Sequence, residues 1–233
     1  MQQFTRYEFK YQITPAVAEA IRARLLRFGM EPDPESAKYP HHIYPVTSLY
    51  FDTPTMSDYH AKAGGFLRRK KIRVRIYAPY LIVHPIWLEK KEKHEMLVSK
   101  KRVRLTQEDY DNLLYGSRLA LVQNHPLFLP LLTDGMRPTA MVSYQREPFI
   151  SPYQSNLRIT FDAHIEACLT HDLRVPMPMT AIAKDSVIME VKFSFGIPFW
   201  FRLILAEFNL RRQSFSKYGE AMEALYRFHQ IPR

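Results

Sequence analysis

The chain has 233 residues, of which 46% are hydrophobic, so it can bury a sizeable core and is not expected to be disordered. Its 33 Lys and Arg residues outnumber its 23 Asp and Glu residues, and the resulting net charge of +10 favours an anionic partner. Cys168 is the single cysteine, which excludes an intramolecular disulfide and a multi-thiolate metal site.

Capping residues and apolar spacing predict four helices. The first follows Thr14 and Pro15 and ends at Gly29, and the second begins at Thr106 and ends at Gly116. Two more are expected over residues 198–210 and 217–229, with apolar faces that cover one side of the strands.

Eight further segments have the period of two that is typical of strands. They are residues 4–11, 47–52, 69–77, 86–93, 98–105, 139–149, 157–165 and 187–193. No fixed repeat and no Gly/Ser linker divides the sequence. We therefore expect a single domain over residues 1–233.

One predicted strand carries a row of cations. Because side chains alternate between the two faces of a strand, residues 69–77 place four cations on one face at a spacing of ~6.6 Å. They are Arg69, Lys71, Arg73 and Arg75. Adjacent cations repel by ~0.6 kcal/mol in water, but by about 2.5 kcal/mol at an effective dielectric constant of 20. An exposed row would be tolerated, whereas an enclosed row needs bound anions.

Comparable rows in other predicted strands also contain glutamates, at Glu8, Glu89 and Glu190. Carboxylates repel a nucleic-acid backbone, so we expect no nucleic-acid partner. They suit a phosphate bound together with a divalent metal, because their oxygens bind the metal while Lys and Arg neutralise the phosphate. The charged sides of the strands could then line a closed barrel whose apolar sides face covering helices.

Ordered motifs along nearly the whole chain resemble the VTC (vacuolar transporter chaperone) domain, the polyphosphate-polymerase branch of the triphosphate tunnel metalloenzymes. The motifs are Arg6-Tyr7-Glu8-Phe9-Lys10-Tyr11, Ser48-Leu49-Tyr50-Phe51-Asp52, Arg73-Val74-Arg75, Trp87-Leu88-Glu89-Lys90-Lys91, Tyr144-Gln145-Arg146, Arg158-Ile159-Thr160-Phe161-Asp162, Glu190-Val191-Lys192 and Phe215-Ser216-Lys217-Tyr218. The resemblance implies an α+β fold: a closed eight-stranded antiparallel β-barrel, the triphosphate tunnel, with flanking helices.

The resemblance also implies an activity, the transfer of the terminal phosphoryl group of ATP to a growing polyphosphate chain with Mn2+ or Mg2+. The implied catalytic residues are Lys217, Arg73, Arg75 and Arg146. The implied phosphate-binding residues are Lys10, Lys91, Lys100, Arg102, Tyr144, Arg158, Lys192 and Ser216, and the implied metal ligands are Glu190, Glu8 and Glu89. Related hydrolases favour ExExK on the first strand, and Arg6 stands at its first Glu position, which favours the polymerase branch.

Three other functions stay open from the sequence. A triphosphatase would use water as the acceptor, a non-catalytic module would bind polyphosphate without turnover, and an RNA-binding protein would expose Arg73 and Arg75 to solvent. We expect a cytoplasmic protein without a membrane-spanning segment, with ATP and polyphosphate as partners. A membrane-protein partner on the apolar residues 119–132 is a further option.

Overall fold

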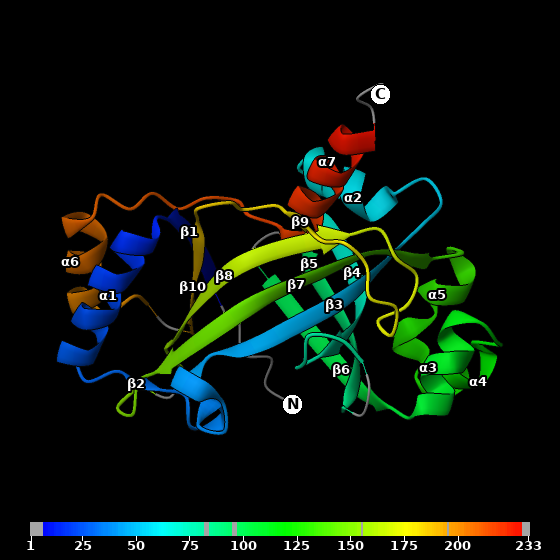
Figure 1. Cartoon of the computed structure of the whole chain (residues 1–233), viewed down its shortest axis with the longest axis horizontal. Helices are drawn as coiled ribbons and strands as arrows, with labels where there is room; N and C mark the ends of the chain where they lie inside the picture. Colours follow the sequence, from blue (N-terminus) through cyan, green and yellow to red (C-terminus); the bar gives the residue numbers. More distant parts are fainter. Residues whose placement is uncertain (1–6, 82–83, 95–96, 155, 195, 230–233) are drawn as a thin grey trace. The chain divides into compact units, whose positions relative to one another are not determined.

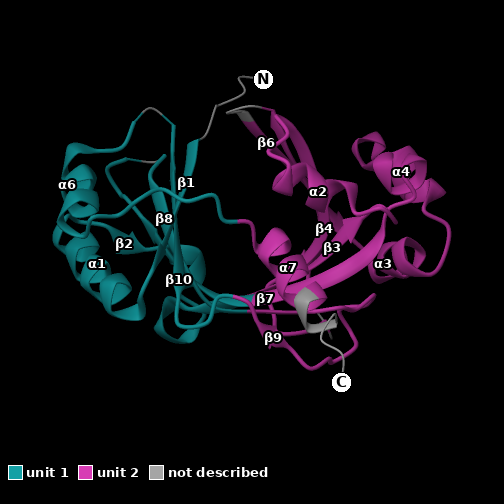
Figure 2. Cartoon of the chain, turned by 90° about the horizontal axis from the view of Figure 1, so that it is seen from above, with its two compact units in different colours: residues 1–45, 144–165, 183–215 teal, residues 46–143, 166–182, 216–233 magenta. Residues whose placement is uncertain are grey.

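The computed structural model describes residues 7–81, 84–94, 97–154, 156–194 and 196–229 (Figure 1). The chain forms two compact units, which Figure 2 shows in different colours. Unit 1 combines residues 1–45, 144–165 and 183–215, and unit 2 combines residues 46–143, 166–182 and 216–233. The single domain expected over residues 1–233 stays a prediction, because compactness alone does not say whether either unit folds by itself.

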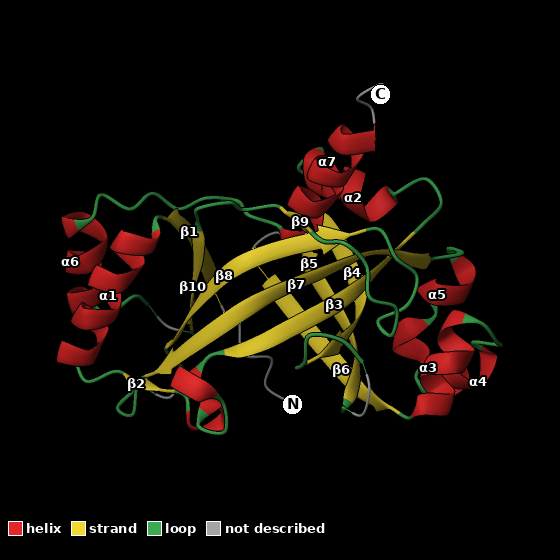
Figure 3. Ribbon diagram, viewed as in Figure 1, coloured by secondary structure: helices red, strands yellow, loops and turns green. Residues whose placement is uncertain are grey.

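Unit 1 contains an antiparallel sheet with two helices beside it (Figure 3). Its strands are β1 (Tyr7–Ile13), β10 (Val187–Phe193), most of β8 (Arg158–Cys168), part of β7 (Arg137–Ile150) and β2 (Glu31–Pro32). Helices α1 (Pro15–Arg27) and α6 (Phe199–Glu207) lie side by side, and Arg24 pairs with Glu207 at 2.6 Å. Two short 3-10 helices, Pro34–Ser36 and Pro40–His42, complete the unit.

Unit 2 contains a larger set of paired strands and most of the helices. Its strands are most of β3 (Tyr44–Asp52), β4 (Arg68–Ile76), β5 (Ile86–His94), β6 (Leu97–Leu105) and β9 (Thr180–Ala181), with the remaining residues of β7 and β8. Its helices are α2 (Ser57–Ala63), α3 (Gln107–Leu114), α4 (Leu119–Asn124), the 3-10 helix Pro126–Phe128, α5 (Pro130–Thr133) and α7 (Lys217–His229).

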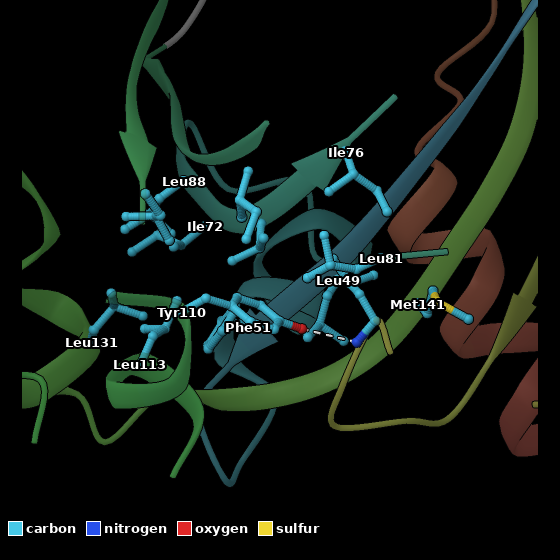
Figure 4. Packing of buried hydrophobic residues seen from close by; sticks show 14 of the residues in the cluster. Leu49, Phe51, Ile72, Ile76, Leu81, Leu88, Tyr110, Leu113, Leu131 and Met141 are labelled. Atoms are coloured by element: carbon cyan, nitrogen blue, oxygen red, sulfur yellow. Dashed lines mark hydrogen bonds between the residues drawn. The ribbon is translucent and has the colours of Figure 1, made fainter. Parts of the chain in front are cut away.

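The core of unit 2 joins these strands to helices α3 and α5. Figure 4 shows Leu49 and Phe51 of β3 packed with Tyr110 of α3, whose hydroxyl accepts a hydrogen bond of 2.9 Å from the backbone N–H of Leu173. Ile72 of β4 belongs to the same cluster. The apolar residues of β4, β5 and β6 therefore share one side of these strands and pack in the core, which leaves the alternate residues on the other side.

The sheet is not the closed eight-stranded barrel that the resemblance implies. It has ten strands, in the order β1-β10-β8-β7-β3-β4-β5-β6, with β2 added on β7 and β9 on β8. Closure requires the two end strands to pair, and no pairing described for the chain joins β1 to β6. The eight long strands are those predicted, whereas β2 and β9 have 2 residues each, too few for a period of two to appear. The α+β class with flanking helices is confirmed.

The four predicted helices are confirmed, and side-chain caps mark the starts of α1 and α3. The hydroxyl of Thr14 accepts from the N–H of Val17 at 3.3 Å, and Thr106 forms a capping box with Asp109. Helices α2, α4 and α5 are missing from the sequence prediction because they are short and have no side-chain cap at the N-cap residue. Every helix in the described ranges is too short or too polar to cross a lipid bilayer.

Candidate functional site

The three strands β4, β5 and β6 of unit 2 present one strongly cationic side, which we call the basic face. The antiparallel register aligns Arg69 with Lys93 and Val98, Lys71 with Lys91 and Lys100, Arg73 with Glu89 and Arg102, and Arg75 with Trp87 and Arg104. Residues directly opposite each other share a side of the sheet. Nine cations and one carboxylate among these twelve positions give the basic face a formal charge of +8, against +10 for the whole chain.

The apolar core fixes this arrangement. Ile72, Val74 and Leu88 lie on the opposite side of the same strands and are fully buried, at 0% exposure. A register slip of one residue would exchange the two sides and place the cations in the core, so the slip is strongly disfavoured. The cationic row is thus a consequence of where the apolar residues must pack.

The strand β4 part of the basic face is enclosed, in contrast to the exposed row that an RNA-binding surface requires. The Arg73 and Arg75 side chains are only 16% and 5% exposed. On β6 the side chains of Lys100 and Arg102 are exposed. The basic face therefore has a buried edge on β4 and an open edge on β6.

Glu89 lies at the centre of the buried edge and contacts three cations. Its carboxylate is 2.8 Å from the Arg73 guanidinium, 3.8 Å from that of Arg75 and 2.6 Å from the Lys100 ammonium. Arg73 also donates to the hydroxyl of Tyr50 at 2.9 Å, and Arg75 donates to the hydroxyl of Ser48 at 3.0 Å. These bonds hold both guanidinium groups in place on one carboxylate.

The charges in this group shift one another's pKa values. Burial raises the pKa of Glu89, but the attraction of Arg73, Arg75 and Lys100 outweighs it and holds the pKa well below the ordinary value for Glu. Partial burial lowers the pKa of Lys100 to about 7, with Arg73 and Arg75 adding to the effect and Glu89 opposing it. The single carboxylate of Glu89 thus does not neutralise the three cations that contact it.

The N-terminus of helix α7 supplies two more of the predicted residues. Ser216 caps the helix, since its hydroxyl accepts from the N–H of Gly219 at 3.1 Å, and it also accepts from the Lys71 ammonium of the basic face at 2.5 Å. Lys217 is 7% exposed. The free N–H groups of a helix start favour anions, so a cation and an N-cap Ser at this position are consistent with a phosphate ligand.

A buried network joins this helix end to Arg73. The Tyr218 hydroxyl donates to the Asp52 carboxylate at 2.7 Å, and the Tyr218 ring stacks on Tyr50 at a centroid distance of 5.0 Å. Asp52 is 1% exposed and also accepts from the backbone N–H groups of Thr53, Asp58 and Tyr59. Asp52 therefore fixes the start of helix α2 and the start of helix α7 with the same carboxylate.

Unit 1 gathers the remaining predicted residues into a charge-balanced group. The register aligns Glu8 with Lys192 and Lys10 with Glu190. The Lys10 ammonium lies 3.3 Å from Glu8 and 3.5 Å from Glu190, and it donates to the backbone carbonyl of Phe215 at 3.0 Å. Lys192 lies 3.3 Å from Glu190. Two cations and two carboxylates thus balance in this group, whereas the twelve aligned positions of the basic face carry a formal charge of +8.

Arg146 of β7 is held by a carboxylate that the sequence prediction did not assign to the site. Its guanidinium makes two parallel hydrogen bonds of 2.7 Å to Asp162, whose residue is fully buried. Burial disfavours the charge of Arg146, but Asp162 raises the pKa of Arg146 well above its ordinary value. The guanidinium also lies 5.2 Å from the centroid of the Tyr144 ring and 3.6 Å from Glu190. Arg158 in the same unit pairs with Asp33 at 2.8 Å.

The residues of unit 1 fit a divalent metal better than Glu89 does. Within the described ranges, no group of three or more His, Cys, Asp or Glu side chains gathers as a metal-binding set. Glu8 and Glu190 nevertheless approach the same ammonium group, and the hydroxyl of Thr160, aligned with Glu190 in the sheet, is buried without a hydrogen-bond partner. Two carboxylates and a hydroxyl are hard oxygen donors that suit Mg2+ or Mn2+ bound mainly through substrate phosphates.

The structure thus places the predicted residues in two groups. Unit 2 brings together Arg73, Arg75, Glu89, Lys91, Lys100 and Arg102 on the basic face, with Ser216 attached through Lys71 and Lys217 beside it in the chain. Unit 1 brings together Glu8, Lys10, Tyr144, Arg146, Glu190 and Lys192, while Arg158 pairs with Asp33. Arg6 lies outside the described residues.

Three residues that position these groups were missed: Tyr50, Asp52 and Asp162. Lys71 was recognised in the row of alternating cations, but its contact with Ser216 was not. Tyr50, Asp52 and Asp162 stand inside the quoted motifs, but the partner of each lies elsewhere in the chain.

Comparisons with known proteins agree with this geometry. The VTC domain matches residues 5–226, and no curated protein matches the chain. Among solved structures, the PH1819 protein from Pyrococcus horikoshii OT3 is 15% identical, with a TM-score of 0.52 over 94% of this chain and 99% of that one. A putative adenylate cyclase from Bacillus halodurans is 13% identical, with a TM-score of 0.51 over 93% of this chain and 96% of that one.

A third structure is that of HpAC1 from Hippeastrum, described as a putative adenylyl cyclase with a dominant triphosphatase activity. It is 13% identical, with a TM-score of 0.52 over 94% of this chain and 96% of that one. At these identities the likeness shows a shared fold, while the match to residues 5–226 shows the family.

Proposed function

Because the chain belongs to the VTC domain family, we propose that it is an enzyme that transfers the terminal phosphoryl group of ATP to a polyphosphate chain with the help of Mn2+ or Mg2+. The observation that carries this proposal is the basic face. It has a formal charge of +8, and its edge on β4 is enclosed. A row of like charges attracts a ligand with a repeating negative charge. Polyphosphate is such a ligand.

Phosphoryl transfer asks the protein mainly for alignment and for neutralisation of charge. Arg73 and Arg75 are held in place by Glu89, Tyr50 and Ser48, so their guanidinium groups can bind phosphate oxygens with little loss of side-chain freedom. Lys217 and the start of helix α7 would bind a further phosphate group. The acceptor is a phosphate oxygen that carries no proton at neutral pH, so no general base is needed.

In unit 1 we propose that Glu8 and Glu190 hold the metal and that Lys10, Arg146, Arg158 and Lys192 bind phosphate, with the Tyr144 ring against the Arg146 guanidinium. A divalent metal there would supply charge neutralisation of phosphate oxygens. Lys10 would exchange part of its contact with these carboxylates for phosphate. Glu89 is assigned a different role, as the counter-charge of Arg73, Arg75 and Lys100, because three adjacent cations repel a metal ion.

Hydrolysis of a triphosphate is the second candidate function, since a dominant triphosphatase activity is described for HpAC1, which has the same fold. The two reactions share phosphate binding and differ in the acceptor, which is water in one and polyphosphate in the other. The enclosed β4 edge of the basic face favours an anionic acceptor, because an anion is attracted by the surplus charge and water is not.

The test is to incubate the purified protein with ATP and Mn2+ and to follow ADP, free phosphate and long-chain polyphosphate together. ADP with polymer supports the polymerase, whereas ADP with equal free phosphate and no polymer identifies the hydrolase. Absence of both products would refute the proposal and leave a binding module.

A matched pair of variants links the activity to the basic face. Arg73→Met removes a cation from the buried edge, whereas Arg68→Met removes an exposed arginine from the opposite side of the same strand. We expect a loss of turnover of about 100-fold or more for Arg73→Met, the size typical of a lost group that stabilises transferring charge. Arg68→Met should stay near wild-type activity, and equal losses in both variants would separate the activity from the basic face.

A further inference from the structure

Trp87 is out of place among the residues of the basic face. The register sets it directly between Arg75 of β4 and Arg104 of β6, and all but one of the other positions on that face are charged. Its neighbours Ile86 and Leu88 point to the other side of β5 and are 2% and 0% exposed. Trp87 itself is only half-buried and belongs to neither hydrophobic cluster. Core packing therefore does not account for an indole at this position.

The indole is oriented by an arginine. The guanidinium carbon of Arg102 lies 4.4 Å from the centroid of the Trp87 ring, the geometry of a cation–π contact. Arg102 is aligned with Glu89 and Arg73, one step along the sheet from Trp87, and its side chain is exposed. The two flat groups, an indole and a guanidinium, thus lie next to the cluster of Glu89, Arg73 and Arg75: Trp87 is directly opposite Arg75 and about 7 Å along β5 from Glu89, and Arg102 is directly opposite Glu89.

We propose that Trp87 and Arg102 form a stacking platform for the base of a nucleoside triphosphate whose phosphates bind on Arg73 and Arg75. Bases stack on tryptophan rings and on arginine guanidinium planes, and such stacking tolerates every base because each has a π-face. The inference rests on the proposed function and extends it: the platform makes the site prefer a nucleotide over an inorganic triphosphate. It also predicts weak discrimination between ATP and GTP.

The first test compares two substrates in one variant. Trp87→Leu should raise the KM for ATP by about 5- to 140-fold, the equivalent of one lost stacking contact, and should leave the KM for tripolyphosphate within about twofold. Trp87→Phe should restore most of the affinity for ATP. Trp200→Leu is the control, because Trp200 belongs to unit 1, where it stacks on Phe28, whereas the basic face belongs to unit 2. Equal changes for the two substrates, or none for ATP, would overturn the platform.

The second test needs no turnover, which separates this inference from the proposed function. The chain has 2 tryptophans, so Trp200→Phe leaves Trp87 as the sole indole fluorophore. ATP, and adenosine at higher concentration, should quench its fluorescence, whereas tripolyphosphate should not. Quenching by ATP in a protein without turnover would refute the enzyme and retain the platform. Identical responses to ATP and tripolyphosphate would refute the platform, whatever the activity.

Discussion

A substitution of Glu89 tests how the positive charge of the basic face is compensated. It is 1% exposed, it contacts Arg73, Arg75 and Lys100, and it is the only carboxylate among the twelve positions of that face. At an effective dielectric constant of 20, each contact at these distances corresponds to an attraction of about 4 to 6 kcal/mol, with the Lys100 contact reduced by solvent. Desolvation of the ions and repulsion among the cations cancel most of this sum. Removing one partner of such a buried group typically costs about 3 to 5 kcal/mol.

The variant Glu89→Gln keeps the shape of the side chain and removes its charge. We expect the free energy of unfolding of the ligand-free protein to fall by about 3 to 5 kcal/mol, which corresponds to a fall in Tm of about 6 to 20 °C for a chain of this size. Tripolyphosphate should then stabilise Glu89→Gln more than wild type, because an anion replaces the missing charge. The Mn2+ concentration needed for half-maximal activity should stay unchanged.

Thermal denaturation with and without 1 mM tripolyphosphate measures both effects. Glu92→Gln is the matched control on the same strand, since Glu92 is 47% exposed, lies on the opposite side and pairs with Lys90. Its Tm should change by no more than about 2 °C. If Glu89→Gln leaves Tm unchanged and instead alters the Mn2+ requirement, the counter-charge reasoning is refuted and Glu89 is a metal ligand.

Three further predictions concern Asp58, Lys100 and Ser216. Burial and nearby Asp52 raise the pKa of Asp58 to about 7, so the folded state retains a proton there. The free energy of unfolding should therefore fall as pH rises from about 4 to about 7. Asp58→Asn should remove this fall in a pH series of Tm values. The pKa of Lys100 is lowered to about 7, so Lys100 is mostly uncharged at pH 8 and should take up a proton when tripolyphosphate binds. Calorimetry in buffers of different ionisation heat measures this uptake, and Lys100→Met should abolish it. Ser216→Ala should lower stability by about 1 kcal/mol in chemical denaturation, because the cap of helix α7 is lost, and unchanged stability would contradict the cap.

Local patterns predicted the elements of this fold well. Alternation of apolar and charged residues located the eight long strands, and Thr14 and Thr106 located two helix starts, because these signals act within a few residues. Helix α2 gave no such signal, since its first N–H groups donate to Thr53 and Asp52 and not to its own N-cap residue. Closure of the sheet could not be read from any strand by itself, and the expectation taken from the resemblance was wrong.

For the candidate site, the sequence pattern predicted which side chains share a face but not which partners they contact. The face shared by Arg73 and Arg75 follows from the period of two, and both side chains are largely buried, although not inside the closed barrel that was expected. The partners were not predictable, because they come from distant parts of the chain. Lys71 reaches Ser216 across 145 residues, and Tyr218 reaches Asp52 across 166. Which carboxylate balances which cation is a property of the tertiary structure.

The unequal charge balance of the two groups has a practical consequence for anyone who handles the protein. The ions of the unit 1 group compensate one another, so ordinary buffers will affect them little. The basic face instead carries a formal charge of +8, so we expect sulfate, citrate or phosphate in a buffer to bind there, raise the apparent melting temperature and compete with substrate. Activities measured in such buffers will be too low, and the choice of counter-ion belongs among the experimental variables.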